Sequence, residues 1–250
     1  MVGWLTDGWQ VFAADPGDWV NHAAPLAEQI AMTQARRHGE TWVAGVDALP
    51  NDADGAVSGG PPLICAALQA AQAVTGPLPL HLGQVSGVFP GYPGRDADET
   101  DAAHRFRLNR DAAHLDGLLP IGPDRRRYLR EPHGWILGLP VTDMPSGAAP
   151  PVVYAGSHHV MRDAMRAVLQ GHPPADWPGI DLTEAYQTAR RAVLADCPRV
   201  VITASPGQSF LIHRLAIHGI ASWTGAANGW RGVVYFRPQL AAMTDWLDLP

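Results

Sequence analysis

Apolar residues in the first third of the chain recur at helical spacing. Residues 19–38 show this pattern and are followed by Gly39, and residues 63–74 are rich in alanine and leucine. Pro61 and Pro62 precede the second segment, and Gly76 follows it, which is the arrangement expected at the start and end of a helix. The pattern therefore predicts two helices before residue 79.

After Gly76 the pattern changes to short apolar runs between turn residues. The runs are too short for typical helices and several are β-branched, so they predict strands. They cover residues 80–88, 135–141, 152–154, 200–203, 209–213 and 232–236. Two helical patterns interrupt them, at residues 160–170 and 182–195, and Asp181 is expected to cap the second.

Strands without regular βαβ alternation favour an antiparallel sandwich or barrel. We therefore expect a mainly β fold with flanking helices and one domain over residues 1–250. Residues 1–79 would form a helical N-terminal part, and about 80–238 the β core, with a helical insertion near 158–196.

Composition narrows the function classes. Glycine (26) and proline (23) are abundant among the 250 residues, as in loop-rich β proteins. The chain has no lysine, which excludes a Schiff-base lysine, a pyridoxal phosphate enzyme and a lysine-bearing P-loop. The net charge of −6 makes nucleic acid an unfavourable partner.

Cysteine use and hydropathy point to a cytoplasmic location. Cys65 and Cys197 have no zinc-site spacing, and a reduced chain is expected, although one disulfide stays possible. No segment reaches the roughly 20 apolar residues that span a membrane. Residues 1–7 lack the basic start and apolar run of a signal peptide.

The sequence lacks the G-x-G-x-x-G, G-x-S-x-G and H-E-x-x-H motifs. It contains His114-Leu115-Asp116, in which the imidazole and the carboxylate of a strand point to the same face and can bind one cation. A second histidine would complete a 2-His-1-carboxylate face, as in non-haem Fe(II) oxygenases. The pair alone is weak, because chance gives roughly one H-x-D/E in such a chain and His38-Gly39-Glu40 is another.

The C-terminal part supplies candidates for the rest of such a site. His213 and His218 lie at the end of, or just after, one predicted strand, and Arg231 begins the next. Neighbouring antiparallel strands can bring a histidine and an arginine into one pocket, where the guanidinium suits a carboxylate. Arg214 and Arg237 are rivals of Arg231 for that role.

Three blocks resemble the phytanoyl-CoA dioxygenase-like branch of the Fe(II)/2-oxoglutarate-dependent oxygenases. The blocks are His114–Asp116, then residues 135–143 with a G-S-H turn at 155–158, then residues 207–218 followed by Arg231. The resemblance covers about residues 80–238. It departs from the family at Gln208 and at Pro151-Val152, neither of which is a proposed ligand.

The resemblance implies a double-stranded β-helix (jelly roll) that holds Fe(II) through His114, Asp116 and His218. It implies that 2-oxoglutarate chelates the iron, with its far carboxylate on Arg231, and that O2 is consumed while a small organic molecule is oxidised. The products would be a hydroxylated compound, succinate and CO2. Related halogenases lack the carboxylate ligand, so Asp116 favours hydroxylation or desaturation.

Other residues are candidates for the same site or compete with its ligands. The family spacing selects His218 over His213, and His158 and His159 are expected in a turn rather than as ligands. Gln84 is a candidate donor to 2-oxoglutarate or substrate. The run 125–127 of three arginines is expected to be solvated, although it can attract an anionic substrate.

Two other functions remain open at this point. One is a cupin-like metalloenzyme that does not use 2-oxoglutarate, and the other is a non-catalytic jelly-roll binding module. The sequence identifies neither the substrate nor the oligomeric state.

Overall fold

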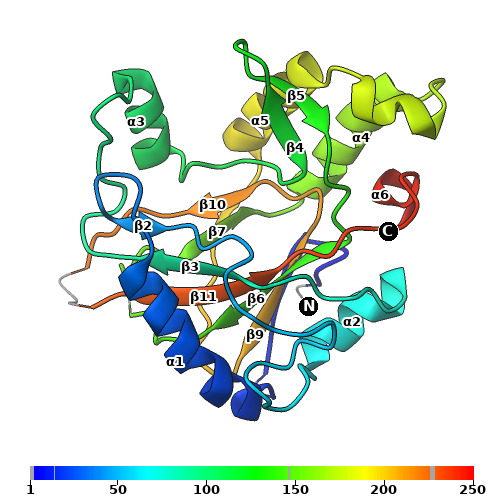
Figure 1. Cartoon of the computed structure of the whole chain (residues 1–250). Coiled ribbons are helices and arrows are strands. Elements are labelled where there is room, and N and C mark those ends of the chain that lie inside the picture. The colour runs from blue at the N-terminus through cyan, green and yellow to red at the C-terminus, as the bar shows by residue number, and fades with distance from the viewer. Residues whose placement is uncertain (1–2, 14, 146, 226–228) are drawn as a thin grey trace.

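The computed structural model describes residues 3–13, 15–145, 147–225 and 229–250, and its fold is mainly β with flanking helices (Figure 1). The strands are β1 (Trp9–Phe12), β2 (Trp42–Val43), β3 (Gln84–Val88), β4 (Leu118–Ile121), β5 (Arg126–Leu129), β6 (Trp135–Pro140), β7 (Pro151–Tyr154), β8 (Arg199–Val201), β9 (Ser209–His213), β10 (His218–Ile220) and β11 (Arg231–Phe236). The helices are α1 (Gly17–Thr33), α2 (Ala66–Thr75), α3 (Asp101–Asn109), α4 (Ser157–Leu169), the 3-10 helix Pro174–Gly179, α5 (Thr183–Asp196) and α6 (Asp245–Asp248).

Two antiparallel sheets form the centre of the fold. The larger has the strand order β1-β9-β6-β11-β3-β2, and the smaller has the order β10-β7-β8. A single bridge between His114 and His218 extends the smaller sheet beyond β10. Apolar side chains of β6, β9 and β11 (Ile136, Phe210, Ile212 and Val233) pack with Val153 of β7 in one cluster, so the two sheets share a core.

The helices cover the outer faces of both sheets (Figure 1). Leu137, Leu211 and Val234 alternate with the inward residues of the same strands and pack with Trp19 and Ala23 of α1. On the smaller sheet, Val152 and Tyr154 pack with residues of α4 and α5, including Met161 and Tyr186. Both faces of the central strands are therefore buried, which explains why these strands appear in the sequence as unbroken apolar runs.

Most predicted elements are present, with shifted ends. The strand predicted over 209–213 is β9, and Gly76 ends α2 with a left-handed φ of 71°. The first predicted helix ends at Thr33 rather than at residue 38, because the chain becomes extended at Gln34. The predicted cap at Asp181 is wrong by one residue, because α5 begins at Thr183 and Leu182 is its N-cap residue. The Asp181 carboxylate still accepts a hydrogen bond from the Thr183 N–H at 2.9 Å.

The helical interpretation of residues 1–79 was incomplete. β1 pairs with β9, and β2 pairs with β3, so this part supplies both edge strands of the larger sheet. The expected G-S-H turn is limited to Ala155 and Gly156, where Gly156 has a left-handed φ of 77°. Because α4 begins at Ser157, His158 and His159 lie in a helix rather than in the expected turn. Helix α3 and the β4–β5 hairpin were not predicted.

Candidate metal centre

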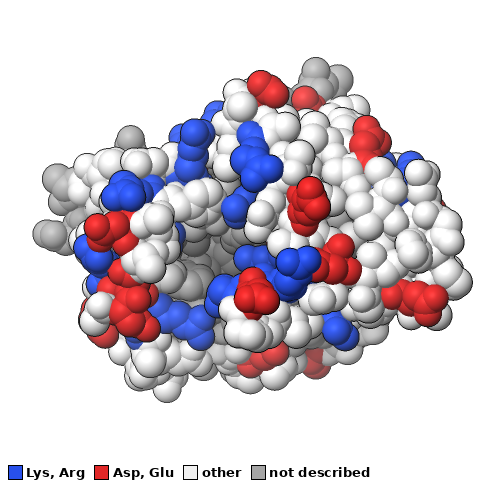
Figure 2. Space-filling view, turned by 90° about the horizontal axis from the view of Figure 1, so that it is seen from above, with Lys and Arg blue, Asp and Glu red and all other residues white. Residues whose placement is uncertain are grey.

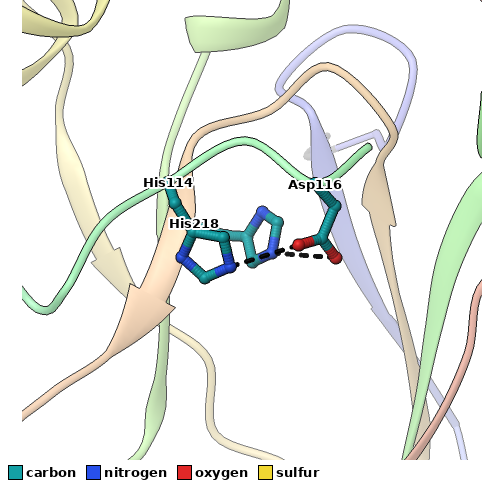
Figure 3. Close-up of side chains that lie close together, drawn as sticks. All are labelled: His114, Asp116 and His218. Carbon is teal, nitrogen blue, oxygen red and sulfur yellow. Dashed lines mark ion pairs between the residues drawn. The ribbon is translucent and has the colours of Figure 1, made fainter. Parts of the chain in front are cut away.

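His114, Asp116 and His218 converge on one point (Figure 3). Each offers one ligand atom, and these atoms all lie within 4.8 Å of one another. The Asp116 Oδ1 is 3.2 Å from the His114 Nε2, and its Oδ2 is 3.6 Å from the His218 Nε2. This set of two imidazoles and one carboxylate can bind a metal ion.

The backbone brings the two histidines together by an exchange of hydrogen bonds. The His114 N–H donates to the His218 carbonyl at 2.9 Å, and the His218 N–H donates back at 3.1 Å. A Cβ on Gly219 would lie 2.1 Å from the Asp111 carbonyl oxygen, so only glycine permits this approach. The expected strand around His114-Leu115-Asp116 is reduced to this single bridge, and Asp116 lies in the turn that follows it.

Hydrogen bonds to the backbone orient both imidazole rings. The His114 Nδ1 lies 3.0 Å from the Ala112 carbonyl oxygen, and the His218 Nδ1 lies 2.9 Å from the Ala216 carbonyl oxygen. A carbonyl oxygen accepts a hydrogen bond from a protonated Nδ1, and in that tautomer the lone pair is on Nε2. Both Nε2 atoms face Asp116, as Figure 3 shows, so the rings are preset as metal ligands.

Arg237 controls the charge of Asp116. Its Nη1 donates to the Asp116 Oδ2 at 2.9 Å, and its Nη2 donates to the Gln84 side-chain oxygen. Burial alone would raise the pKa of Asp116, but the charges of Arg237 and His218 hold it well below its usual value. Asp116 is therefore an anion at neutral pH, the form that a cation needs.

The three residues lie at one side of a chamber of about 240 Å³ between the two sheets. Ile136, Ile212 and Ile220 form apolar parts of its wall, and Gln84 and Tyr235 are polar parts. The volume falls just below the range of about 300–1,000 Å³ common for ligand pockets. The chamber therefore suits a small molecule.

Arg231 is fully buried without a counter-ion. It has no solvent exposure, and none of its three guanidinium nitrogens has a hydrogen-bond partner of normal geometry among the described residues. The phenol of Tyr235, which lines the chamber, lies beside it. Burial lowers the pKa of this guanidinium and raises that of Tyr235. A buried cation of this kind is costly unless an anion pairs with it.

The two rival arginines already have partners. Arg237 is paired with Asp116 as described. Arg214 is buried elsewhere, and its Nε and Nη1 donate to the carbonyl oxygens of Trp246 and Pro250 at 2.9 and 3.2 Å. Of the three candidates for an incoming carboxylate, Arg231 alone has no guanidinium hydrogen bond of normal geometry within the described parts of the chain.

The remaining candidates lie outside the metal cluster. The ring of His213 packs against His158 at a centroid distance of 4.7 Å and is not in the cluster with Asp116. His158 is in the first turn of α4. In the arginine run, Arg125 and Arg126 are exposed, as expected, and Arg126 pairs with Asp181. Arg127 is partly buried and its guanidinium lies over the Tyr186 ring.

Arg37, Trp42, Ala44 and Val46 also line the chamber, although no sequence pattern singled them out. They come from the segment between α1 and β3, which the family resemblance left unassigned. Residues in a loop show no hydrophobic periodicity that would identify them as part of a chamber. The nearby motif His38-Gly39-Glu40 supplies no metal ligand, and its His38 ring stacks on Trp42.

The chain matches no protein-family model and no curated protein. It resembles the solved structure of SnoK, described as a non-heme alpha ketoglutarate dependent carbocyclase from nogalamycin biosynthesis, with 16% identity and a TM-score of 0.52 over 97% of this chain and 85% of that one. EctD from S. alaskensis with bound Fe is 14% identical, with a TM-score of 0.49 over 95% of this chain and 74% of that one. At these identities the likeness to SnoK shows a shared fold.

The same comparison includes HygX from Streptomyces hygroscopicus, solved with nickel, 2-oxoglutarate and hygromycin B, at 12% identity and a TM-score of 0.47 over 95% of this chain and 85% of that one. EctD and HygX are thus proteins seen with metal. No helix in the described parts of this chain is long and apolar enough to cross a membrane. The cytoplasmic location and the exclusion of nucleic acid stay predictions.

Proposed function

We propose that this protein is a non-haem Fe(II)- and 2-oxoglutarate-dependent oxygenase with a double-stranded β-helix core. The observation that carries the proposal is the convergence of His114, Asp116 and His218 within 4.8 Å at the side of a chamber. Two imidazoles and one carboxylate on one face of an ion leave its other positions open, which is the ligand arrangement of Fe(II) oxygenases.

The path of the chain between the sheets supports the β-helix core. β3 and β6 belong to the larger sheet, and the His114 bridge that comes between them in sequence belongs to the smaller one. The chain then alternates from β7 and β8 in the smaller sheet to β9 in the larger, β10 in the smaller and β11 in the larger. Such alternation is expected when two sheets are wound together as a jelly roll.

The residues present fit both groups that the proposal requires. Two imidazoles with their Nδ1 atoms close to carbonyl oxygens, together with an ionised carboxylate, suit Fe(II). The unpaired guanidinium of Arg231 suits the far carboxylate of 2-oxoglutarate, which would remove the cost of the buried cation.

When bound, iron and 2-oxoglutarate supply O2-dependent oxidation, in which one oxygen atom enters succinate with loss of CO2 and the other oxidises the substrate. The residues of this chain supply position and charge. Arg237 holds one oxygen of Asp116 by a hydrogen bond and keeps the carboxylate ionised and oriented toward the histidines. The apolar walls at Ile136, Ile212 and Ile220 exclude water from the reacting carbon.

The substrate in this proposal is a small organic molecule, and the reaction is hydroxylation or desaturation. The chamber volume supports the size of the substrate. The presence of Asp116 as a carboxylate ligand supports these reactions over halogenation, since a halide would need the coordination position that the carboxylate fills.

Succinate formation tests the proposal against its two rivals. Purified protein supplied with Fe(II), 2-oxoglutarate and O2 is expected to release succinate, and His218→Ala is expected to abolish the release. His159→Ala is the matched control, because His159 is exposed and outside the cluster. Metal binding without succinate would indicate the cupin-like metalloenzyme, and absence of metal binding would indicate the binding module.

A further inference from the structure

The segment between α1 and β3 forms one wall of the chamber through Arg37, Trp42, Ala44 and Val46. We propose that Arg37 binds an anionic group of the substrate while Trp42 packs against its apolar body. The substrate class is then a small organic acid. This inference rests on the proposed function, because it places the substrate beside the iron ligands.

Arg37 is a cation at the chamber without a protein counter-ion. It forms no ion pair with any acidic residue that the structure describes. Asp116 is the one acidic residue among the described residues that line the chamber, and its carboxylate is already engaged by Arg237 and the two histidines. The charge of Arg37 is therefore available to a ligand.

The charge balance of the site with iron and 2-oxoglutarate bound also favours an anionic substrate. Iron, Arg37, Arg231 and Arg237 together carry more positive charge than Asp116 and the two carboxylates of 2-oxoglutarate neutralise. The face shown in Figure 2 has a hollow bordered by arginine side chains, although the whole chain has a net charge of −6. A positively charged, partly apolar chamber favours an anionic ligand over a neutral one of the same shape.

Trp42 is held in place beside Arg37. The two residues exchange backbone hydrogen bonds, at 2.7 Å from the Arg37 N–H and 3.1 Å from the Trp42 N–H. The Trp42 indole Nε1 donates to the Ser86 hydroxyl at 3.2 Å. The His38 ring stacks on the indole at 5.1 Å with an interplanar angle of 5°. The Trp42 indole and the backbone of Arg37 are thus held together beside the chamber.

The turn between Arg37 and Trp42 is strained and clamped. His38, Gly39 and Glu40 have φ values of 55°, 59° and 64°, in the left-handed region that costs energy for non-glycine residues. Asp96 fixes this turn, since its carboxylate accepts from the Gly39 N–H at 2.9 Å and contacts the His38 Nδ1 at 3.0 Å. The backbone of Arg37 is therefore set before a ligand arrives, which reduces the backbone entropy lost on binding.

Benzoate and benzamide are suitable probes, because they share a flat ring and differ in charge. We expect the 2-oxoglutarate-loaded protein, with and without Fe(II) under anaerobic conditions, to bind benzoate at least about tenfold more tightly than benzamide by calorimetry. Arg37→Gln should remove this preference. Arg36→Gln is the matched control, because Arg36 lies over the Phe89 ring at 3.5 Å and is outside the chamber lining.

Each outcome has a distinct meaning. Equal binding of the two probes by the unaltered protein, no binding of benzoate, or an unchanged preference in Arg37→Gln would overturn the inference. A large rise in the 2-oxoglutarate requirement of Arg37→Gln would also overturn it, by assigning Arg37 to the cosubstrate. Failure of the proposed function is seen separately, as absence of Fe(II)-dependent succinate formation, and the iron-free titration still tests Arg37 in that case.

Discussion

Replacement of Arg231 by methionine is expected to make the ligand-free protein more stable and the 2-oxoglutarate complex weaker. Arg231 is fully buried, and its guanidinium nitrogens have no hydrogen-bond partner of normal geometry among the described residues. Methionine has a similar length and no charge, so it fills the site without leaving a buried cation unpaired. If Arg231 serves ligand binding at a cost to stability, its replacement should raise the stability of the free protein and lower its affinity for 2-oxoglutarate.

The magnitudes follow from the burial. Removal of the unpaired buried cation should raise the free energy of unfolding of the ligand-free protein by about 1–3 kcal/mol. Loss of the cation from the complex leaves the far carboxylate of 2-oxoglutarate buried and unpaired, which should cost at least about 3 kcal/mol, or about a hundredfold in affinity. At a hundredfold excess over its Kd, 2-oxoglutarate stabilises the unaltered protein by about 2.7 kcal/mol, and the variant should gain little.

Urea unfolding with and without 2-oxoglutarate measures both effects, and Arg214→Met is the matched control. Arg214 is equally buried, but its guanidinium donates to carbonyl oxygens near the C-terminus. Its replacement leaves those carbonyls unpaired and should destabilise the protein by about 1–3 kcal/mol. The reasoning about Arg231 is refuted if Arg231→Met destabilises the ligand-free protein as Arg214→Met does, or if it leaves the stabilisation by 2-oxoglutarate unchanged.

Three further changes test other parts of the account. Arg237→Met should lower the affinity for Fe(II) about tenfold or more in an anaerobic titration, because Asp116 loses the partner that orients it. Arg237→Lys should lose less of this affinity than Arg237→Met. Equal Fe(II) affinities of Arg237→Met and the unaltered protein would contradict this role. Gly138→Ala should lower the free energy of unfolding by about 1–3 kcal/mol in urea, because a Cβ would lie 2.1 Å from the Phe210 ring, and an unchanged midpoint would show that the ring moves freely. Burial lowers the pKa of His158 from 6.5 to about 4, so its contribution to stability is full above pH 6.5 and is lost as the pH falls toward 4, by up to about 3 kcal/mol. His158→Gln should therefore reduce the dependence of the free energy of unfolding in urea on pH between 6.5 and 4. An unaltered pH dependence would contradict the assignment.

The strands were predictable where burial on both faces leaves an unbroken apolar run. β9 matches its predicted range, and β6 and β11 differ by one residue at an end, because inward and outward positions of these strands are both buried. β1 and β2 were not predicted, because each is short and becomes a strand only by pairing with β9 or β3, which are distant in sequence. Pairing over such distances leaves no local signal.

Some residues of the candidate site were predictable from the sequence and others were not. The spacing within His114-Leu115-Asp116 and the family-like block around His218 predicted three residues that the structure brings together. The sequence did not separate Arg231 from its two rivals, because all three flank predicted strands, and only their hydrogen-bond partners distinguish them. Arg37 lines the chamber and directly precedes a left-handed turn at residues 38–40, and no hydrophobic periodicity predicts such a turn.

The central claim is that three side chains, distant in sequence, bind one ferrous ion that also binds 2-oxoglutarate. Anaerobic addition of Fe(II) and 2-oxoglutarate should produce a weak visible charge-transfer band that saturates at one iron per chain. His114→Ala should remove the band, and His159→Ala should retain it. An undiminished band in His114→Ala would contradict the account.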